Sequence, residues 1–421
     1  MLHRLKSVFF KKHWWTKKRV IVFLLLLAVS IVMSVVHGSK QDTGGDFYVF
    51  WLSGKHFLEG STLYDVPEGA RPFIYPPFAA MLFAVFTLLP LKVSAGLFYF
   101  INILLFVVSI YLTYRIFVLL YSERPFKKLP LIFAVLFSAR FFFNNMGLLQ
   151  INEVVFIVCL GGIYTFLINK NRVSGPLFVI ASFIKIVPLF FVGWLLVRGR
   201  KSVVLPIVVS SIICFSLPVL LRGFDTGMQD WKEYNRSFLS TFQEGKVVTS
   251  YTNQNLAAAL YRMALPIDNS ENLNYQIASL SEKTVEEFYK IISVLILILF
   301  IGNIVFLRIK RADITAFEIS SIFLVGHLLS GITWKAHLVT FIFIFMTFFS
   351  VDYKALKNFP KAVMYFIAFL IALVGLTGRD VIGSTLHYYS GGYSIIVWMM
   401  VMLFMCSIWF SIKPRVLGVN K

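Results

Sequence analysis

The chain has 421 residues, of which 58% are hydrophobic and only 14% are charged, and its formal net charge is +20. This balance excludes a water-soluble domain, because a surface in contact with water needs far more charged residues. Apolar runs of roughly 17–25 residues, the length that crosses a bilayer as a helix, recur from end to end. The sequence therefore predicts an all-α polytopic membrane protein.

The positive charge is not arranged as on a nucleic-acid-binding surface, and we expect no nucleic-acid partner. Lys and Arg gather in short segments between apolar runs, which is typical of cytoplasmic loops that face anionic lipid. These segments are 11–19, 124–128, 170–172, 198–201, 308–311, 354–361 and 413–415. Placing all of them on one side predicts a multi-pass protein of the cytoplasmic membrane with both termini in the cytoplasm.

In chain order, the first predicted span is 19–38. It resembles a signal peptide, but no A-x-A-like site precedes Gln41, so we interpret it as an uncleaved signal anchor. An aromatic-rich outer loop, 39–92, follows and carries Gly44-Gly45-Asp46 near its start. Further spans are predicted at 94–121, 129–144 and 150–168. The run 174–197 has basic clusters at both ends, so it should cross twice, as short helices 174–185 and 186–197 hinged near Lys185 and Pro188.

A span at 203–221 completes a seven-span N-terminal module, 1–221, within a single membrane domain of residues 1–421. A second outer loop, 222–288, precedes spans at 289–307, 314–332, 336–351, 361–377 and 393–412. The run 77–90 is short for a span, and we interpret it as a re-entrant or interfacial helix. The prediction is thus a bundle of about twelve transmembrane helices, with eleven or thirteen left open, and amphipathic helices in the first outer loop.

With this topology, the unusual polar residues lie on the outer side. A carboxylate at the rim of a membrane must be solvated, paired or used, so Asp46 is a candidate general base. Each candidate also has a purely structural interpretation. Asp46 could simply end a helix, and Lys185 could keep its stem in lipid and its ammonium at the interface. Gln150 and Asn152 could form hydrogen bonds between helices, His337 could be an interfacial residue, and Arg262 could be a loop cation. Together they predict one polar cavity that opens outward. The set is Asp46, Asn144, Asn145, Gln150, Asn152, Ser182, Lys185, Asn253, Gln254, Asn255, Arg262, Trp334, Lys335, His337, Arg379, Asp380 and His387.

No motif indicates a bound cofactor or metal ion. The chain has no Walker A loop, no G-x-G-x-x-G after a strand and no H-E-x-x-H. Its seven histidines are dispersed, and no D-x-D pair is present in an outer loop. Cys159, Cys214 and Cys406 all fall within apolar runs, so neither a disulfide framework nor a cysteine metal site is expected.

Several short motifs occur in the order found in glycosyltransferase-C enzymes. The first outer loop resembles theirs, and the ordered set resembles the polyprenol-phosphate-mannose-dependent mannosyltransferases that include the mycobacterial phosphatidylinositol mannoside enzymes. Two positions depart from that pattern: Leu149 stands where Gly is usual, and Asn255 where Ser is common. The motifs are Asp46-Phe47-Tyr48, Gly60, Leu63-Tyr64-Asp65, Tyr75-Pro76-Pro77, Gln150-Ile151-Asn152, Lys185-Ile186-Val187-Pro188, Asn253-Gln254-Asn255-Leu256 and His337.

The resemblance implies a glycosyltransferase-C bundle that moves a hexose, with mannose as the first candidate, from a polyprenyl-phosphate donor to a glycolipid or glycan acceptor. An inverting displacement needs a base for the acceptor hydroxyl and cations for the departing phosphate. Asp46 is then the expected base. Lys185, His337 and Arg262 are expected at the phosphate. Gln150, Asn152, Asn253 and Gln254 are expected to orient sugar hydroxyls, and Tyr75 belongs to the aromatic substrate-binding loop.

Two other functions fit a polytopic chain. A polymerase or ligase of lipid diphosphate-linked glycans also has many spans and a large outer loop, but it would favour paired arginines there over an early Asp. A transporter or lipid flippase would place polar residues on both sides of the membrane midplane. It would also show repeat symmetry, and we detect no internal repeat.

Overall fold

The computed structural model describes residues 17–64, 71–121, 127–199, 201–239, 246–266, 273–354 and 356–412. Within these ranges all regular structure is helical. Several residues on which the sequence predictions rest, namely Lys11, Asp65, Arg124, Arg200 and Lys413, lie outside the described ranges.

Every span predicted in the N-terminal half coincides with a helix. The correspondence includes the break predicted near Lys185, because one helix ends at Ile184 and the next begins at Leu189. The helices are α2 (Lys17–Ser39), α5 (Leu91–Leu120), α6 (Lys128–Gly147), α7 (Asn152–Leu167), α8 (Asn171–Ile184), α9 (Leu189–Arg198) and α10 (Val204–Arg222).

The five spans predicted in the C-terminal half also coincide with helices. These are α14 (Glu282–Ile309), α15 (Ala316–Leu329), the 3₁₀ turn η4 (Lys335–Thr340) continuing into α16 (Phe341–Phe349), α17 (Asn358–Leu376) and α19 (Ile395–Ile412). In the described part of the chain, 7 helices are long and apolar enough to cross a membrane on their own, and the remaining predicted spans coincide with shorter apolar helices. The protein is a helical multi-pass membrane protein.

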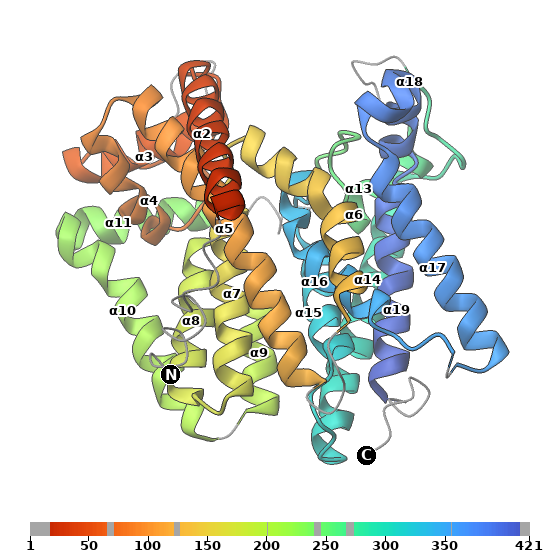
Figure 1. Cartoon of the computed structure of the whole chain (residues 1–421). Helices are drawn as coiled ribbons and strands as arrows, with labels where there is room; N and C mark the ends of the chain where they lie inside the picture. Colours follow the sequence, from red (N-terminus) through yellow and green to blue (C-terminus); the bar gives the residue numbers. More distant parts are fainter. Residues whose placement is uncertain are drawn as a thin grey trace.

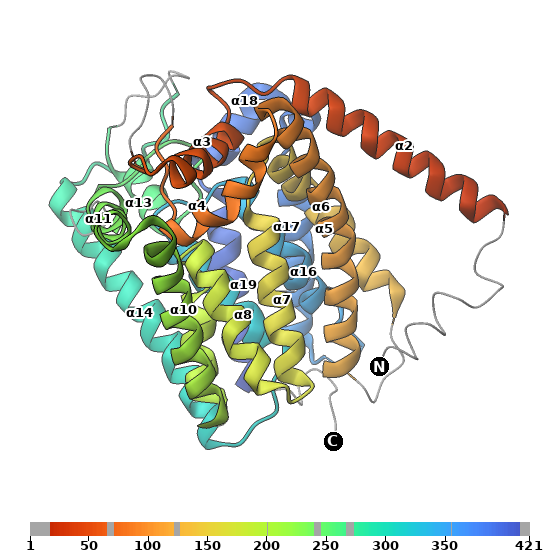
Figure 2. The same ribbon diagram turned by 90° about the vertical axis from the view of Figure 1, so that its left-hand side faces the viewer.

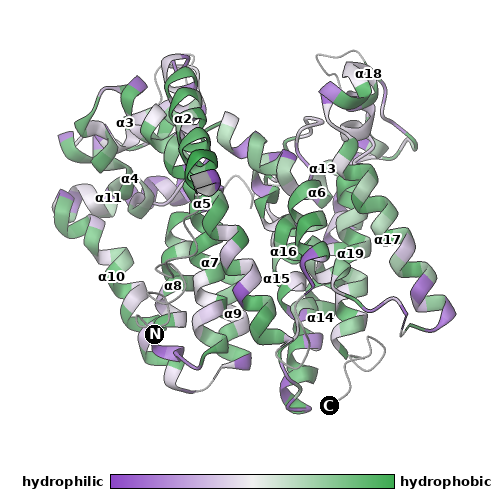
Figure 3. Cartoon of the chain, viewed as in Figure 1, coloured by the Kyte–Doolittle hydropathy of each residue, from purple (hydrophilic) through white to green (hydrophobic). Residues whose placement is uncertain are grey.

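The helices of the two predicted outer loops lie at or toward one end of the bundle. Figure 1 shows α3 (Asp46–Glu59), α13 (Leu256–Ala264) and α18 (Arg379–Gly392) near the top, whereas the α9–α10 and α14–α15 connections lie at the bottom. Apolar residues cover most of the lengths of the helices, with hydrophilic residues mainly toward their ends (Figure 3). This arrangement agrees with the two-sided distribution of loops in the predicted topology.

The short run 77–90 does not form a spanning helix. It folds as α4 (Pro77–Phe83) and the 3₁₀ helix η1 (Ala84–Leu88), and Leu89 and Pro90 then lead into α5. Both short helices pack against α3, and α4 also contacts α10 and α11 (Phe224–Tyr234). A helix of this length cannot cross about 30 Å of hydrocarbon, so the segment serves as a support for α3.

Helix α2 lies apart from the bundle over most of its length (Figure 2), and only 6% of its apolar window is buried. Its contact with the rest of the protein is a crossing of small residues near its C-terminal end. A Cβ atom at Gly38 would come within 2.8 Å of the Gly96 Cα on α5, and the ring of His37 stacks on Tyr99 at 4.4 Å. Small residues let two membrane helices approach closely, which fixes where the chain enters the first outer loop.

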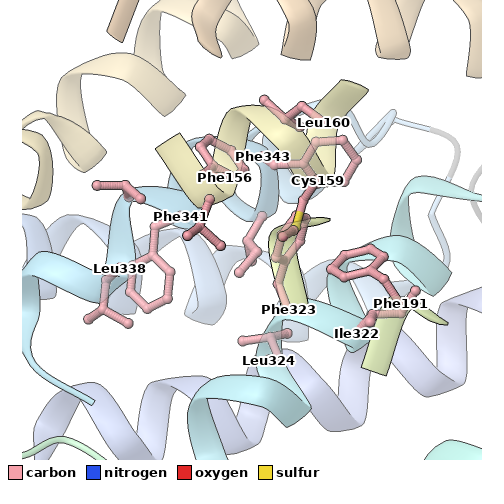
Figure 4. Packing of buried hydrophobic residues seen from close by; sticks show 14 of the residues in the cluster. Phe156, Cys159, Leu160, Phe191, Ile322, Phe323, Leu324, Leu338, Phe341 and Phe343 are labelled. Carbon is pink, nitrogen blue, oxygen red and sulfur yellow. The ribbon is translucent and has the colours of Figure 1, made fainter. Parts of the chain in front are cut away.

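A core of aromatic and aliphatic side chains joins the two halves of the bundle directly below the outer end. Figure 4 shows residues of α7, α9, α15 and α16 meeting there. Phe323 of α15 lies 5.6 Å from Phe156, 4.8 Å from Phe191 and 5.8 Å from Phe343, measured between ring centroids. Edge-to-face and tilted packing of this kind fixes the relative positions of the helices, and thus of the polar residues at their outer ends.

Helix α3 is held against η1 by aromatic rings and by one glycine. Phe50 stacks on Phe83 at 4.5 Å, and Phe47, which is fully buried, contacts Phe83, Phe86 and Phe98. Between these rings the backbones approach so closely that a Cβ at Gly54 would come within 2.7 Å of the Phe83 carbonyl. The position of Asp46, the first residue of α3, depends on this contact.

We predict that Gly54→Ala lowers the stability of the protein, because the added methyl group would clash with backbone atoms. Overpacking of this kind costs about 1–3 kcal/mol. Gly302→Ala on α14 is the matched control, since a Cβ there meets nothing within 4 Å and alanine is favoured over glycine within a helix. Thermal unfolding in detergent should show a lower midpoint for the Gly54 variant and an unchanged or higher midpoint for the Gly302 variant. Equal midpoints would contradict the close packing of α3.

Candidate active site

A cavity of about 980 Å³ opens among the bundle helices and the loops that join them. Its walls come from α3, the segment 71–76, α9, α14, α15 and the segment 329–337. One part is polar and includes Asp46, Arg71, Gln150, Lys185 and His337. The other part is apolar and is formed between α9 and α14 by Phe190, Gly193, Trp194, Val197, Leu297, Phe300, Ile301 and Ile304. The cavity therefore combines a polar part that contains charged side chains with an apolar part between two helices.

Asp46 lies in the polar part, where its two carboxylate oxygens have different partners. Oδ2 accepts a hydrogen bond from Gln150 Nε2 at 2.6 Å, and Oδ1 forms an ion pair with Arg71. Tyr75 donates its hydroxyl to Gln150 Oε1 at 3.2 Å. Burial and the nearby charge of Asp46 both raise the pKa of Tyr75, so the phenol stays protonated and can act as this donor. Tyr75 thereby fixes the Gln150 amide, and the amide fixes the carboxylate.

Lys185 stands at the end of a chain of asparagines that runs across three helices. Its ammonium donates to Asn152 Oδ1 at 2.7 Å, Asn152 donates to Asn145 at 3.2 Å, and Asn145 donates to Asn102 at 3.0 Å. The chain ends where Asn102 donates to the Phe98 carbonyl at 2.9 Å. The Lys185 ammonium also lies 5.9 Å from the centre of the Tyr75 ring. Each amide is satisfied on both sides, so the chain holds Lys185 at a fixed place in the cavity wall.

Local backbone conformation explains how these side chains reach the cavity. Lys185 ends α8 in an extended conformation, with φ −151° and ψ 129°, and Pro188 immediately precedes α9. Between α6 and α7, Leu149 is buried with φ 51°. This left-handed conformation costs a non-glycine residue about 1–2 kcal/mol, which is a physical reason for the glycine usual at this position in the enzymes that the sequence resembles. The turn places Gln150 and Asn152 at the start of α7.

His337 and Trp334 form one side of the polar part. The Trp334 backbone N–H donates to His337 Nδ1 at 3.2 Å, so the ring carries its proton on Nε2. The indole Nε1 of Trp334 is buried and has no hydrogen-bond partner among the described residues. A small second cavity of about 60 Å³ is lined by Asn152, Lys185 and His337. These three residues therefore stand together in the wall between two cavities.

The Asn253-Gln254-Asn255 motif connects the second outer loop to the segment that carries Trp334. Asn253 accepts a hydrogen bond from Thr333 N at 2.9 Å, and Gln254 N donates to the Thr333 carbonyl at 2.6 Å. Asn255 donates to the carbonyls of residues 330 and 331 and caps α13 by accepting from Ala258 N at 2.7 Å. Asn253 and Gln254 do not line the large cavity, whereas Asn255 does. The motif therefore positions the wall that contains His337.

Arg262 is also placed away from the cavity. It is 1% exposed and donates to the carbonyls of Thr249, Ser250 and Gly392 and to the hydroxyl of Ser394, at 2.6–3.2 Å. Its guanidinium thus joins the second outer loop to the turn between α18 and α19. The structure brings Asp46, Tyr75, Gln150, Asn152, Lys185 and His337 together, and it does not bring Arg262, Asn253 or Gln254 to them.

Two residues of the site, Arg71 and Asn102, were missed by sequence reasoning. Arg71 precedes Tyr75 by four positions, but a single arginine in a long loop carries no distinguishing pattern. Asn102 lies in the middle of an apolar span. A buried amide there is costly unless it is hydrogen-bonded, so its presence in this span could have indicated a polar network. Trp334, which belongs to the polar set named from the sequence, does line the cavity. No group of three or more His, Cys, Asp or Glu suited to a metal ion occurs within the described ranges.

Comparison with known proteins places the chain in a family. A model of glycosyltransferase family 87 matches residues 73–331, well over half of the sequence. The chain belongs to glycosyltransferase family 87. No curated protein matches it significantly. The matched range of family 87 contains Tyr75, Gln150, Asn152 and Lys185 but not Asp46, Arg71 or His337, so the importance of these last three rests on their geometry in the cavity.

We predict that Arg262→Met destabilises this family 87 protein strongly. The change leaves buried carbonyls without donors, and hydrogen bonds to charged groups contribute about 1.5–3 kcal/mol each. Arg379→Met is the control, because Arg379 is exposed on α18. A lowered thermal midpoint for the Arg262 variant alone is the expected result. A stable Arg262 variant would argue against the anchoring role.

Proposed function

We propose that this membrane glycosyltransferase transfers a hexose, with mannose as the first candidate, from a polyprenyl-phosphate donor to a hydroxyl of a glycolipid or glycan. The reaction would occur at the outer face of the cytoplasmic membrane. The observation that carries the proposal is that Asp46 and Lys185 share one cavity with an apolar wall formed by two membrane helices. The proposal involves no metal or cofactor, since the lipid phosphate is itself the leaving group.

The apolar part of the cavity suits a prenyl chain. Residues of α9 and α14 line it, and Ile301 there is 54% exposed. Neither helix offers a carboxylate along this part of the wall, whose lining is aromatic, aliphatic and glycine. A lipid tail lying between the helices would gain roughly 25 cal/mol for each Å² of apolar surface removed from water, or would exchange bilayer contacts for equivalent ones. Its phosphate would then lie near the polar part.

The charge of the cavity suits an anionic headgroup. Four cationic side chains line it, namely Arg71, Lys185, Lys246 and Lys290, against the two carboxylates Asp46 and Glu286. Lys185 is fixed by Asn152 and keeps two further N–H donors. His337 lies on the neighbouring wall. A phosphate between these groups would be stabilised as its charge develops during departure.

The chemical step is an inverting displacement. The acceptor hydroxyl oxygen attacks the anomeric carbon while Asp46 takes the hydroxyl proton, and the bond from that carbon to the phosphate oxygen breaks. The lipid phosphate keeps the bonding electrons and leaves. Gln150 donates to Oδ2, and we assign the proton to the other carboxylate oxygen, Oδ1. Asn152 orients Lys185, and Gln150 orients Asp46. Gln150 and Asn255 also face the cavity, where their amides can contact sugar hydroxyls.

We predict that Asp46→Asn abolishes transfer while the protein still binds the donor. The amide keeps the shape of the side chain but cannot take a proton, and general base catalysis contributes about 10²–10⁴-fold. Turnover of a polyprenyl-phosphate sugar by the purified variant measures the effect. More than about a tenth of wild-type turnover would remove Asp46 from the role of base.

We predict that Lys185→Met weakens donor binding about ten- to a hundred-fold, because a charge-assisted hydrogen bond to the phosphate contributes roughly 1.5–3 kcal/mol. The methionine keeps most of the apolar stem, so folding should survive. Lys55→Met on α3 is the control, since Lys55 pairs with Glu59 and does not line the cavity. Donor titration of both variants beside wild type tests this. Unchanged donor affinity and turnover in the Lys185 variant would leave the phosphate to His337 and its neighbours.

A further inference from the structure

Both carboxylate oxygens of the base proposed above have partners in the structure. Gln150 donates to Oδ2 of Asp46, and Arg71 pairs with Oδ1, the atom to which the proposed mechanism assigns the acceptor proton. An acceptor hydroxyl and the Arg71 guanidinium therefore compete for the same oxygen. Transfer of the proton to Oδ1 would therefore be favoured by opening of the Arg71–Asp46 ion pair.

Arg71 differs from the other arginines that contact the outer loops. Arg222 is 1% exposed in its side chain and donates to the carbonyls of residues 56, 57 and 61. Arg262 is equally buried and bonded to several carbonyls. The Arg71 side chain is 53% exposed, lines the cavity and pairs with the Asp46 side chain. Burial and backbone hydrogen bonds immobilise the other two arginines, whereas Arg71 can exchange its partner at little cost.

We propose that Arg71 is a mobile phosphate ligand, which caps Asp46 in the empty enzyme and moves to the donor phosphate when the donor binds. The inference rests on the proposed function, since it takes the donor to be a lipid phosphate. Binding of the donor then has two effects: the phosphate gains a guanidinium, and Oδ1 of Asp46 becomes free for the acceptor hydroxyl.

The chemistry of the partners favours this exchange. A guanidinium binds a phosphate through two parallel N–H···O bonds, whereas Arg71 contacts Asp46 through Oδ1 alone. Lys185 and Arg71 line the same cavity, and Lys185 lies 5.9 Å from the ring centre of Tyr75, which bonds to Gln150, so a phosphate beside Lys185 would lie in the same polar pocket as Arg71. Lys185 is held by Asn152 and supplies a fixed charge, while Arg71 supplies a movable one.

The exchange makes binding ordered, with the donor before the acceptor. An acceptor that arrives first meets a carboxylate whose reactive oxygen is occupied. The ion pair also keeps the empty site from activating a water molecule at Asp46. Arg71 thus binds the donor and pairs with the base until the donor arrives. Removing Arg71 should affect donor binding more than the chemical step.

The binding test compares a polyprenyl phosphate with the uncharged polyprenol of the same chain length, titrated calorimetrically into the purified full-length protein. Wild type should prefer the phosphate. Arg71→Met should lose about ten- to a hundred-fold of that preference and bind the polyprenol as wild type does. Arg71→Lys should restore part of it, and Arg379→Met, which removes a charge outside the cavity, should match wild type.

A phosphate preference that is unchanged in Arg71→Met would overturn the inference. If wild type itself does not prefer the phosphate to the alcohol, the proposed donor class fails instead, so the two failures are distinct. Steady-state kinetics supply a second readout. Arg71→Met should raise the donor KM by tenfold or more with a smaller change in kcat at saturating donor, whereas an unchanged donor KM contradicts the role assigned to Arg71.

Discussion

The candidate site depends on pairing and orienting one carboxylate near one end of an apolar bundle. A buried charge is costly unless it is paired and hydrogen-bonded, and Asp46 obtains both from residues that other elements position. Gln150 comes from the start of α7, Arg71 from the segment before α4, and Asp46 from the first turn of α3. The close contact of α3 with η1 positions Asp46, and the left-handed turn at Leu149 positions Gln150 beside it. If either contact were lost, the carboxylate would lack its partners.

Farther from Asp46, other buried polar side chains are also held by hydrogen bonds. The chain from Asn102 to Asn152 satisfies buried amides inside the membrane region and ends at the Lys185 ammonium. On the opposite wall, Asn253, Gln254 and Arg262 join loops that are far apart in sequence and thereby place Trp334 and His337. The enzyme thus separates residues that face the substrate from residues that hold the walls. Both groups are polar and lie near the membrane rim, so they look alike in a sequence.

Much of the architecture could be predicted, because the lengths of the apolar runs and the positions of the basic loops indicate where the chain crosses the membrane. Helix positions, the break at Lys185 and the short supporting segment after Tyr75 all follow from such patterns, and the structure confirms them. Pairings between distant residues do not follow. Nothing in the sequence shows that Arg71 meets Asp46, or that Arg262 turns toward carbonyls of α18 rather than toward a phosphate. A cation in an outer loop can serve either purpose, and only its surroundings in the fold decide which.

The central claim is that the sugar donor is a lipid phosphate whose departure Asp46 and Lys185 assist. The most direct measurement incubates the purified protein in detergent with a panel of polyprenyl-phosphate sugars and with the corresponding nucleotide sugars, and follows release of the free lipid phosphate or nucleotide in the presence of a membrane glycolipid extract. The account predicts release of polyprenyl phosphate from at least one hexose donor and no release from any nucleotide sugar. Transfer from a nucleotide sugar, with the polyprenyl-phosphate sugars left intact, would contradict it.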